Sequence, residues 1–104
     1  MNWKDSKNQR FVEAVLSLET PKETQAFLRD LLTEGEIAEF SKRFYAAEML
    51  SSNVSYSQIE KETGLSSTTV ARVSKWLNDG MGGYKGIINK LHHTPIVKIR
   101  KGLS

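Results

Sequence analysis

The chain has 104 residues, a formal net charge of +3 and no cysteine. This length allows one domain with a modest core, and the lack of cysteine excludes a disulfide framework and a thiolate metal site. The amino-terminal residues do not resemble a signal peptide and no apolar stretch is long enough to cross a bilayer, so the sequence predicts a cytoplasmic protein without a membrane partner.

The charge is unevenly distributed along the chain. Residues 1–80 carry ten Lys and Arg against twelve acidic side chains, whereas residues 81–104 carry five basic side chains and no acidic one. A basic excess of this kind suggests a polyanionic partner, although a solvated tail would explain the last ten residues more simply.

Two helices are expected before residue 33. Residues 3–18 carry apolar side chains at helical spacing, which predicts a first helix. In the second helix, Thr20 can act as the N-cap, Pro21 occupies the first helical position and Glu23 can complete a capping box. Residues 26–32 make this helix apolar around much of its circumference. Because such a helix requires burial on more than one side, we expect a second copy of the chain to supply part of the cover.

A third helix is predicted from Thr33 to about Ser51. Thr33 and Glu36 form another capping-box pattern, and the glutamates of the first turns stand where the helix dipole favours anions. Glu39 and Arg43 are four residues apart, in the order that favours a modest surface ion pair.

Residues 55–77 have the pattern of a helix-turn-helix. Ser55 can cap the first short helix, and Gln58 lies three residues on, as a capping box requires. Gly64 suits the end of that helix because glycine adopts a positive φ at little cost, and the apolar Leu65 is expected to fill the corner of the turn.

The second short helix, capped by Ser66 or Ser67, has two different faces. Val70, Val73 and Leu77 recur at three- and four-residue intervals and predict one buried face. The other face carries short hydroxyl side chains and then Arg and Lys, which is what a recognition helix in a major groove requires. An ordinary αα-hairpin with a polar outer face is the simpler alternative.

The predicted DNA-binding residues are the polar side chains of this unit. Thr68, Thr69, Arg72 and Lys75 are expected to reach the major groove, and Ser57, Gln58 and Ser67 are expected to lie on phosphates. Tyr56 could contact a phosphate or only cover the core. The complete set is Tyr56, Ser57, Gln58, Ser66, Ser67, Thr68, Thr69, Arg72 and Lys75.

The remaining chain offers no further site. Residues 78–86 contain four of the seven glycines and predict a flexible connector, and a short final helix is predicted from Tyr84, Ile87, Ile88 and Leu91. His92 and His93 are adjacent and do not face each other on a helix, so no metal site or cofactor is expected. Residues 94–104 are basic and are expected to form a mobile tail. Nothing in the sequence indicates an enzyme.

With these residues in view, the chain resembles the tryptophan repressor superfamily, and more closely its small Gram-positive branch of the YerC/YecD type. The resemblance runs from about Phe27 to Leu91 and is strongest at residues 31–36, 43–50 and 57–77. It implies an all-α, six-helix fold in an intertwined homodimer, with residues 1–93 as one helical domain. Two-fold symmetry would then favour a palindromic DNA site with half-sites about one helical turn apart.

The resemblance also implies a candidate ligand pocket formed by Thr33, Arg43, Arg72 and Trp76. In the family's best known member two arginines and a threonine at these places surround a bound tryptophan. The small residues lining that pocket correspond to Val73 and Trp76 here, and Trp76 could fill the space of an indole ring. We therefore expect that tryptophan is not the ligand; another carboxylate corepressor, or none, stays open.

Together these features predict a homodimeric transcriptional regulator that binds double-stranded DNA, with repression as the expected outcome. Two alternatives stay open. One is an adaptor that uses the second short helix on another protein, and the other is a regulator that senses a small carboxylate.

Overall fold

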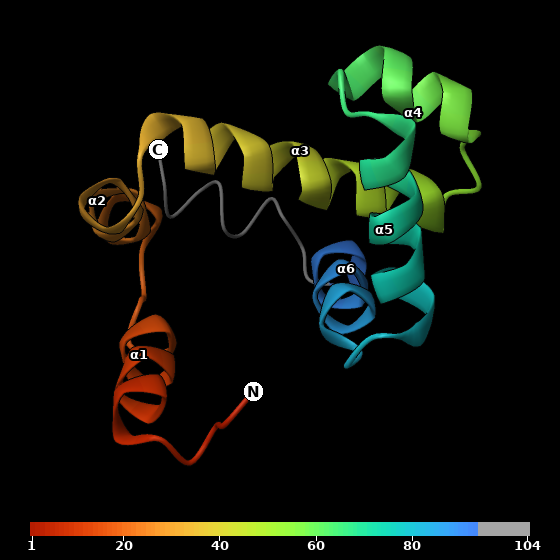
Figure 1. The fold of residues 1–104 in the computed structure, drawn as a ribbon. Helices are drawn as coiled ribbons and strands as arrows, with labels where there is room; N and C mark the ends of the chain where they lie inside the picture. The colour runs from red at the N-terminus through yellow and green to blue at the C-terminus, as the bar shows by residue number, and fades with distance from the viewer. Residues whose placement is uncertain (94–104) are drawn as a thin grey trace.

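The computed structural model describes residues 1–93, which form six α-helices and no strand (Figure 1). The helices are α1 (Ser6–Leu16), α2 (Pro21–Leu31), α3 (Glu34–Ser51), α4 (Tyr56–Thr63), α5 (Ser67–Asp79) and α6 (Gly83–His93). The all-α, six-helix prediction is confirmed. None of these helices is long and apolar enough to span a membrane. The tail predicted to be mobile, residues 94–104, lies outside the described residues.

Side-chain caps fix where the helices begin. The hydroxyl of Thr20 accepts the backbone N–H of Glu23 at 3.1 Å and starts α2. At α3 the hydroxyl of Thr33 accepts the N–H of Glu36 at 3.1 Å, while the Glu36 carboxylate accepts the N–H of Thr33 at 2.9 Å, so the predicted capping box is present. The hydroxyls of Ser55 and Ser66 accept the N–H of Gln58 and of Thr69 and so cap α4 and α5.

Two of the predicted capping boxes are wrong in one bond each. The side chain of Gln58 donates to the carboxylate of Glu62 at 2.8 Å instead of bonding back to Ser55. Glu62 lies four residues on along the same face of α4, and a charged acceptor binds an N–H more strongly than a neutral one. The carboxylate of Glu23 accepts the N–H of Glu19 at 3.0 Å, one residue before the expected Thr20.

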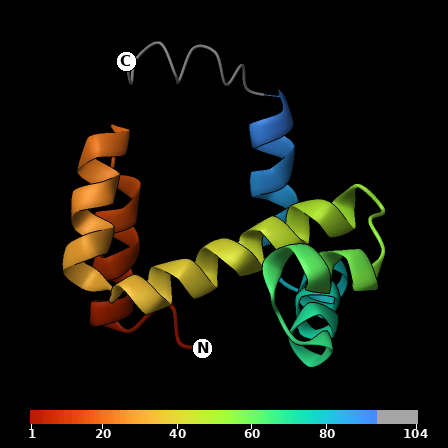
Figure 2. The same cartoon turned by 90° about the horizontal axis from the view of Figure 1, so that it is seen from above.

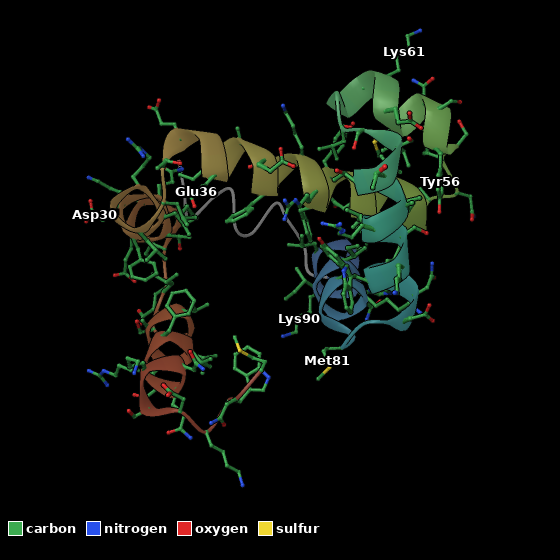
Figure 3. All side chains as sticks on the ribbon, viewed as in Figure 1. Asp30, Glu36, Tyr56, Lys61, Met81 and Lys90 are labelled. Atoms are coloured by element: carbon green, nitrogen blue, oxygen red, sulfur yellow. The ribbon has the colours of Figure 1, made fainter. Side chains whose placement is uncertain are left out.

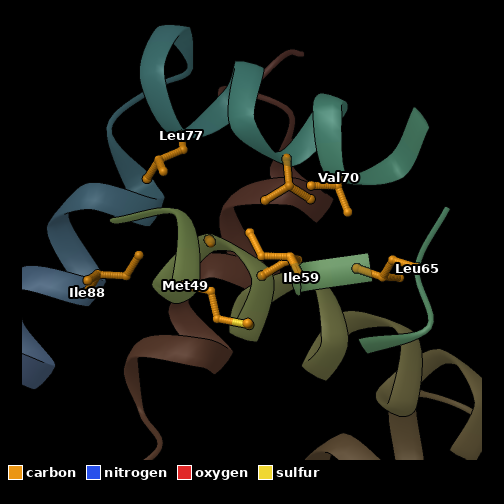
Figure 4. Close-up of a cluster of buried hydrophobic side chains, with 9 residues drawn as sticks. Met49, Ile59, Leu65, Val70, Leu77 and Ile88 are labelled. Carbon is orange, nitrogen blue, oxygen red and sulfur yellow. The ribbon is translucent and has the colours of Figure 1, made fainter. Parts of the chain in front are cut away.

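The core lies at the carboxyl end of α3, where α4, α5 and α6 pack around it (Figure 4). Ala46 and Ala47 are fully buried on α3, and their small side chains let the neighbouring helices approach closely. The remaining buried apolar residues are Met49, Ile59, Leu65, Val70, Val73, Leu77 and Ile88. The core therefore holds the helix-turn-helix unit, α4 and α5, at a fixed place on α3.

Helices α1 and α2 lie at the opposite end of α3 and contain no buried residue (Figure 2). Large apolar side chains stay open to solvent there, with Phe11 48% exposed and Leu16 77% exposed. The radius of gyration is 15.3 Å, whereas a compact domain of this length has about 13 Å. A single copy of the chain therefore buries its carboxyl-terminal half far better than its amino-terminal half.

The glycine-rich connector is shorter than the predicted span 78–86. Helix α5 continues to Asp79, and α6 already begins at Gly83. Gly80 closes α5 by donating its N–H to the carbonyl of Trp76 at 3.0 Å, and a Cβ at this position would collide with that same oxygen. Gly82 turns the chain at φ +82°. Two glycines suffice for this turn, and packing on α3 and α5 offsets the poor helix propensity of the glycines inside α6.

Candidate nucleic-acid interface

The turn between α4 and α5 is locked by backbone and side-chain bonds. Gly64 adopts φ +75° and donates its N–H to the carbonyl of Glu60 at 2.8 Å, as the sequence predicts for the end of α4. Leu65 is 7% exposed and fills the corner. The buried hydroxyl of Thr63 donates to the carbonyl of Ile59 at 2.7 Å and accepts the N–H of Leu65 at 3.2 Å. Thr63 was not expected from the sequence to have a role, because a threonine late in a helix has many possible partners.

Helix α5 separates a buried face from an exposed polar face. Val70, Val73 and Leu77 are buried, as predicted. Successive residues of a helix are about 100° apart, so Thr68 and Lys75 lie nearly opposite this buried face, with Arg72 beside them. All three side chains are exposed. The exposed face predicted for a recognition helix is therefore present.

The other hydroxyl residues at the start of α5 differ in what they can offer. Ser66 and Ser67 are exposed, and Ser66 accepts the N–H of Thr69 at 3.2 Å as the N-cap. The Ser66 hydroxyl also donates to the hydroxyl of Thr69 at 3.0 Å, and Thr69 is half-buried. Thr69 thus belongs to the cap as much as to the exposed face.

The residues predicted to lie on phosphates cluster at the start of α4. Tyr56, Ser57 and Gln58 are all exposed. The Gln58 side chain is already held by Glu62, whereas no hydrogen bond within residues 1–93 uses the phenol of Tyr56. Of these three residues, Tyr56 therefore presents the donor that is most available to an added ligand.

Positive charge on α5 is available for a partner. Within residues 1–93, Arg72 forms neither an ion pair nor a hydrogen bond. The Lys75 ammonium lies 5.9 Å from the centre of the Trp76 ring, a weak contact that an anion can replace. Arg43 differs, because its Nε lies 3.4 Å from the carboxylate of Glu39, the pair that the sequence predicts, and its guanidinium lies 5.7 Å from the centre of the Phe40 ring.

A single copy of the chain does not bring the candidate ligand pocket together. Thr33 caps the start of α3, about 15 Å along the helix axis from Arg43. Arg72 and Trp76 lie on α5, which packs at the far end of α3 (Figure 1). Trp76 is 53% exposed and borders an apolar hollow of about 490 Å³ with Met81 of the connector. Within one chain, Thr33 therefore lies apart from Arg72 and Trp76.

The chain matches the family model of the Trp repressor protein over residues 6–92. It is 36% identical over 81 residues to the uncharacterised protein YerC of Bacillus subtilis (strain 168), and the alignment covers 78% of each chain.

Two solved structures have the same fold. A TrpR-like protein from Eubacterium eligens ATCC 27750 has a TM-score of 0.83 at 33% identity, covering 89% of this chain and 96% of that chain. A proposed Trp repressor from Staphylococcus aureus has a TM-score of 0.82 at 30% identity, covering 88% of this chain and 95% of that chain. The family match over residues 6–92 includes α1 and α2 as well as the helix-turn-helix.

Proposed function

The chain belongs to the Trp repressor protein family, and we propose that it is a cytoplasmic regulator that represses transcription by binding double-stranded DNA through α4 and α5. The observation that carries this proposal is the exposed face of α5. Thr68, Arg72 and Lys75 stand opposite a fully packed apolar face, and the Arg72 guanidinium is unpaired among the described residues. A helix held in this way can enter a major groove without disturbing the core.

The chemistry of the three side chains fits base and phosphate recognition. The fork of an arginine matches the O6 and N7 atoms of guanine, and a threonine contributes a hydroxyl and a methyl group to base edges. Lysine acts as a point charge for phosphate. We assign base contacts to Arg72 and Thr68. We assign phosphate contacts to the remaining exposed polar residues, which are Tyr56, Ser57, Ser67 and Lys75.

We further propose that the regulator is a homodimer whose common interface includes α1 and α2. These helices expose Phe11, Val15, Leu16 and Leu31, each about half exposed or more. Solvent exposure of so many large apolar side chains is unfavourable, and a second copy can cover them. Two copies of α5 then face DNA together, with residues 1–93 of each chain as one helical domain.

We propose that tryptophan does not control this regulator. Val73 is buried in the core and Trp76 occupies the outer side of α5. The Arg43 guanidinium is paired with the Glu39 carboxylate, 3.4 Å from Nε, so a ligand carboxylate would have to compete for it. We therefore propose binding to DNA without a corepressor.

Equilibrium binding to a duplex enriched from a random-sequence library tests this function. We expect Arg72→Ala to weaken binding by about 1–3 kcal/mol, because a bidentate base contact is lost. Arg72→Lys should keep the salt dependence but lose most of the sequence preference, since lysine cannot make the bidentate contact.

Arg43→Ala is the matched control and should leave DNA affinity unchanged. The ligand-sensing alternative is favoured by two results together. Arg43→Ala and Arg72→Ala would weaken duplex binding equally, and an added amino acid would raise the duplex affinity of the wild-type protein. If the wild-type protein enriches no duplex and instead retains one protein after nuclease treatment, the adaptor alternative holds.

A further inference from the structure

A polar groove of about 600 Å³ lies where α3, α4, α5 and α6 meet. Its apolar floor is formed by Leu50, Val54 and Leu77. Leu77 belongs to the buried core, and Leu50 and Val54 pack against that core, so the floor is held in place by the same contacts that hold the helix-turn-helix. The groove therefore moves with α4 and α5 as one body.

Positive charge and hydrogen-bond donors line the rim of the groove. Of the described residues that line it, Lys85 at the start of α6 is the charged one, and no carboxylate is among them. The Tyr56 phenol and the Ser74 hydroxyl each carry a hydrogen that they donate to no group within residues 1–93. A single cation with neutral donors around it favours a small anionic group such as a phosphate.

The groove lies beside the face of α5 that we assign to the major groove. Ser74 and Asn78 are groove residues on α5, and Asn78 is about 60° around the helix from Lys75. Tyr56 approaches from the start of α4, on the side of α5 away from Lys90 (Figure 3). An anion in this groove would therefore sit next to whatever α5 contacts.

We propose that this groove binds one phosphate of the DNA backbone, on the strand that flanks the major groove entered by α5. The Lys85 ammonium supplies the charge, and the hydroxyls of Tyr56 and Ser74 supply directed hydrogen bonds. This inference rests on the proposed DNA-binding function and adds to it a contact from α6, outside the helix-turn-helix. Because phosphate carries no sequence information, the contact positions the protein without changing which bases it prefers.

Affinity for a random-sequence duplex, measured by fluorescence anisotropy across a salt series, tests the proposal. Lys85→Gln should lower the affinity about five- to tenfold near 0.1 M salt and reduce the slope of log affinity against log salt by about one for each bound copy. Tyr56→Phe should lower the affinity less than Lys85→Gln does. Lys85→Arg, which keeps the positive charge, should have an affinity close to that of the wild-type protein. The loss should be the same on an enriched duplex.

Lys90→Gln is the matched control, because Lys90 is an exposed lysine of the same helix that does not line the groove. The proposal is overturned if the slope of log affinity against log salt is the same for the Lys85→Gln and Lys90→Gln variants. It is also overturned if only inorganic phosphate, and not duplex, shifts the amide signals of Tyr56 and Lys85 in NMR spectra. A wild-type protein that binds no duplex at all would instead overturn the proposed function itself.

Discussion

At the residue scale, the turn between α4 and α5 depends on Gly64. Its φ of +75° lies in the region that residues with a Cβ adopt at a cost, and nothing lies within 4 Å of where a Cβ would stand. The free-energy cost of replacing Gly64 therefore comes from backbone strain at this positive φ and not from a steric clash. This position was predictable from the sequence, because a glycine between two capped apolar patterns has few other interpretations.

We predict that Gly64→Ala lowers the free energy of unfolding by about 1–2 kcal/mol, since alanine is strained in the left-handed region. Gly64→Asn should cost less, because asparagine tolerates that conformation. Gly35→Ala in the first turn of α3 is the control, since its added Cβ would meet the Thr33 hydroxyl at an ordinary 3.9 Å. Urea unfolding at one protomer concentration measures all three. A loss for Gly35→Ala as large as for Gly64→Ala would refute the backbone explanation.

A second residue-scale prediction concerns the capping box of α3. The backbone N–H of Thr33, and then its hydroxyl, hold the pKa of the Glu36 carboxyl below its ordinary value of 4.5. A group whose pKa is lower in the folded than in the unfolded state stabilises the fold above the unfolded pKa, and this contribution is lost as pH falls through the folded pKa. Wild-type protein should therefore exceed Glu36→Gln in stability at pH 7, and the difference should be smaller at a pH below the ordinary value of 4.5.

Urea unfolding midpoints at the two pH values measure this effect, and an NMR titration of Glu36 measures its pKa directly. A constant difference between wild type and Glu36→Gln across this range would show that the carboxylate charge contributes nothing.

At the element scale, α4 and α5 owe their placement to the core rather than to their own propensity. Helices of 8 and 13 residues are marginal in water on their own. Ile59 and Val70 are fully buried and tie these helices to Ala46 and Ala47 of α3. The rigid presentation of Thr68 and Arg72 is therefore a consequence of packing at a distance from them.

We predict that Ile59→Ala lowers the free energy of unfolding by about 2–5 kcal/mol, through lost burial and the cavity left behind. Lys61→Ala, an exposed change on the same helix, should stay within about 0.5 kcal/mol of wild type. Urea unfolding followed by circular dichroism gives both values. Near-equal effects would mean that α4 is not anchored through its buried face.

The sequence predicted elements where a local signal sufficed. Thr20, Thr33, Ser55 and Gly64 marked helix ends correctly because capping depends on residues within a few positions. It extended the connector to residue 86, over the first turn of α6, since glycine composition suggested a flexible segment while tertiary packing formed a helix. It also misassigned Gln58, because two partners at helical distance competed for one amide and only the structure shows which one is used.

The candidate site was predictable for the same reason, and only in part. The exposed and buried faces of α5 follow from periodicity, so the exposure of Thr68, Arg72 and Lys75 could be predicted from the sequence. The groove with Lys85 could not, because its lining comes from four elements between residues 50 and 85. The engagement of Thr69 by Ser66 likewise depends on side-chain geometry.

At the scale of the whole molecule, the uneven burial of the two halves is the main feature to explain. Residues of α1 and α2 are held by few neighbours, whereas α3 to α6 share one core (Figure 2). On α1, Phe11, Val12, Val15 and Leu16 form one exposed apolar stripe. A second chain packed on this stripe would give the molecule a continuous interior.

We predict that sedimentation equilibrium gives twice the protomer mass of 11.8 kDa and that the thermal midpoint rises with concentration. Phe11→Asp should shift the protein toward the monomer, because it places a charge within the apolar stripe. Ser6→Asp, on the polar side of α1 where the helix dipole favours an acid, should remain dimeric. A wild-type mass of one protomer would refute the dimer.

Selection of duplexes from a random-sequence library by the purified wild-type protein, read out by sequencing, tests the central claim most directly. We expect an enriched palindrome with half-sites centred about one helical turn apart, which Arg72→Ala fails to enrich. Two results would contradict the assignment of α5 as the element that reads DNA. In one, the wild-type protein enriches no duplex; in the other, the Arg72→Ala variant enriches the same sequence as the wild-type protein.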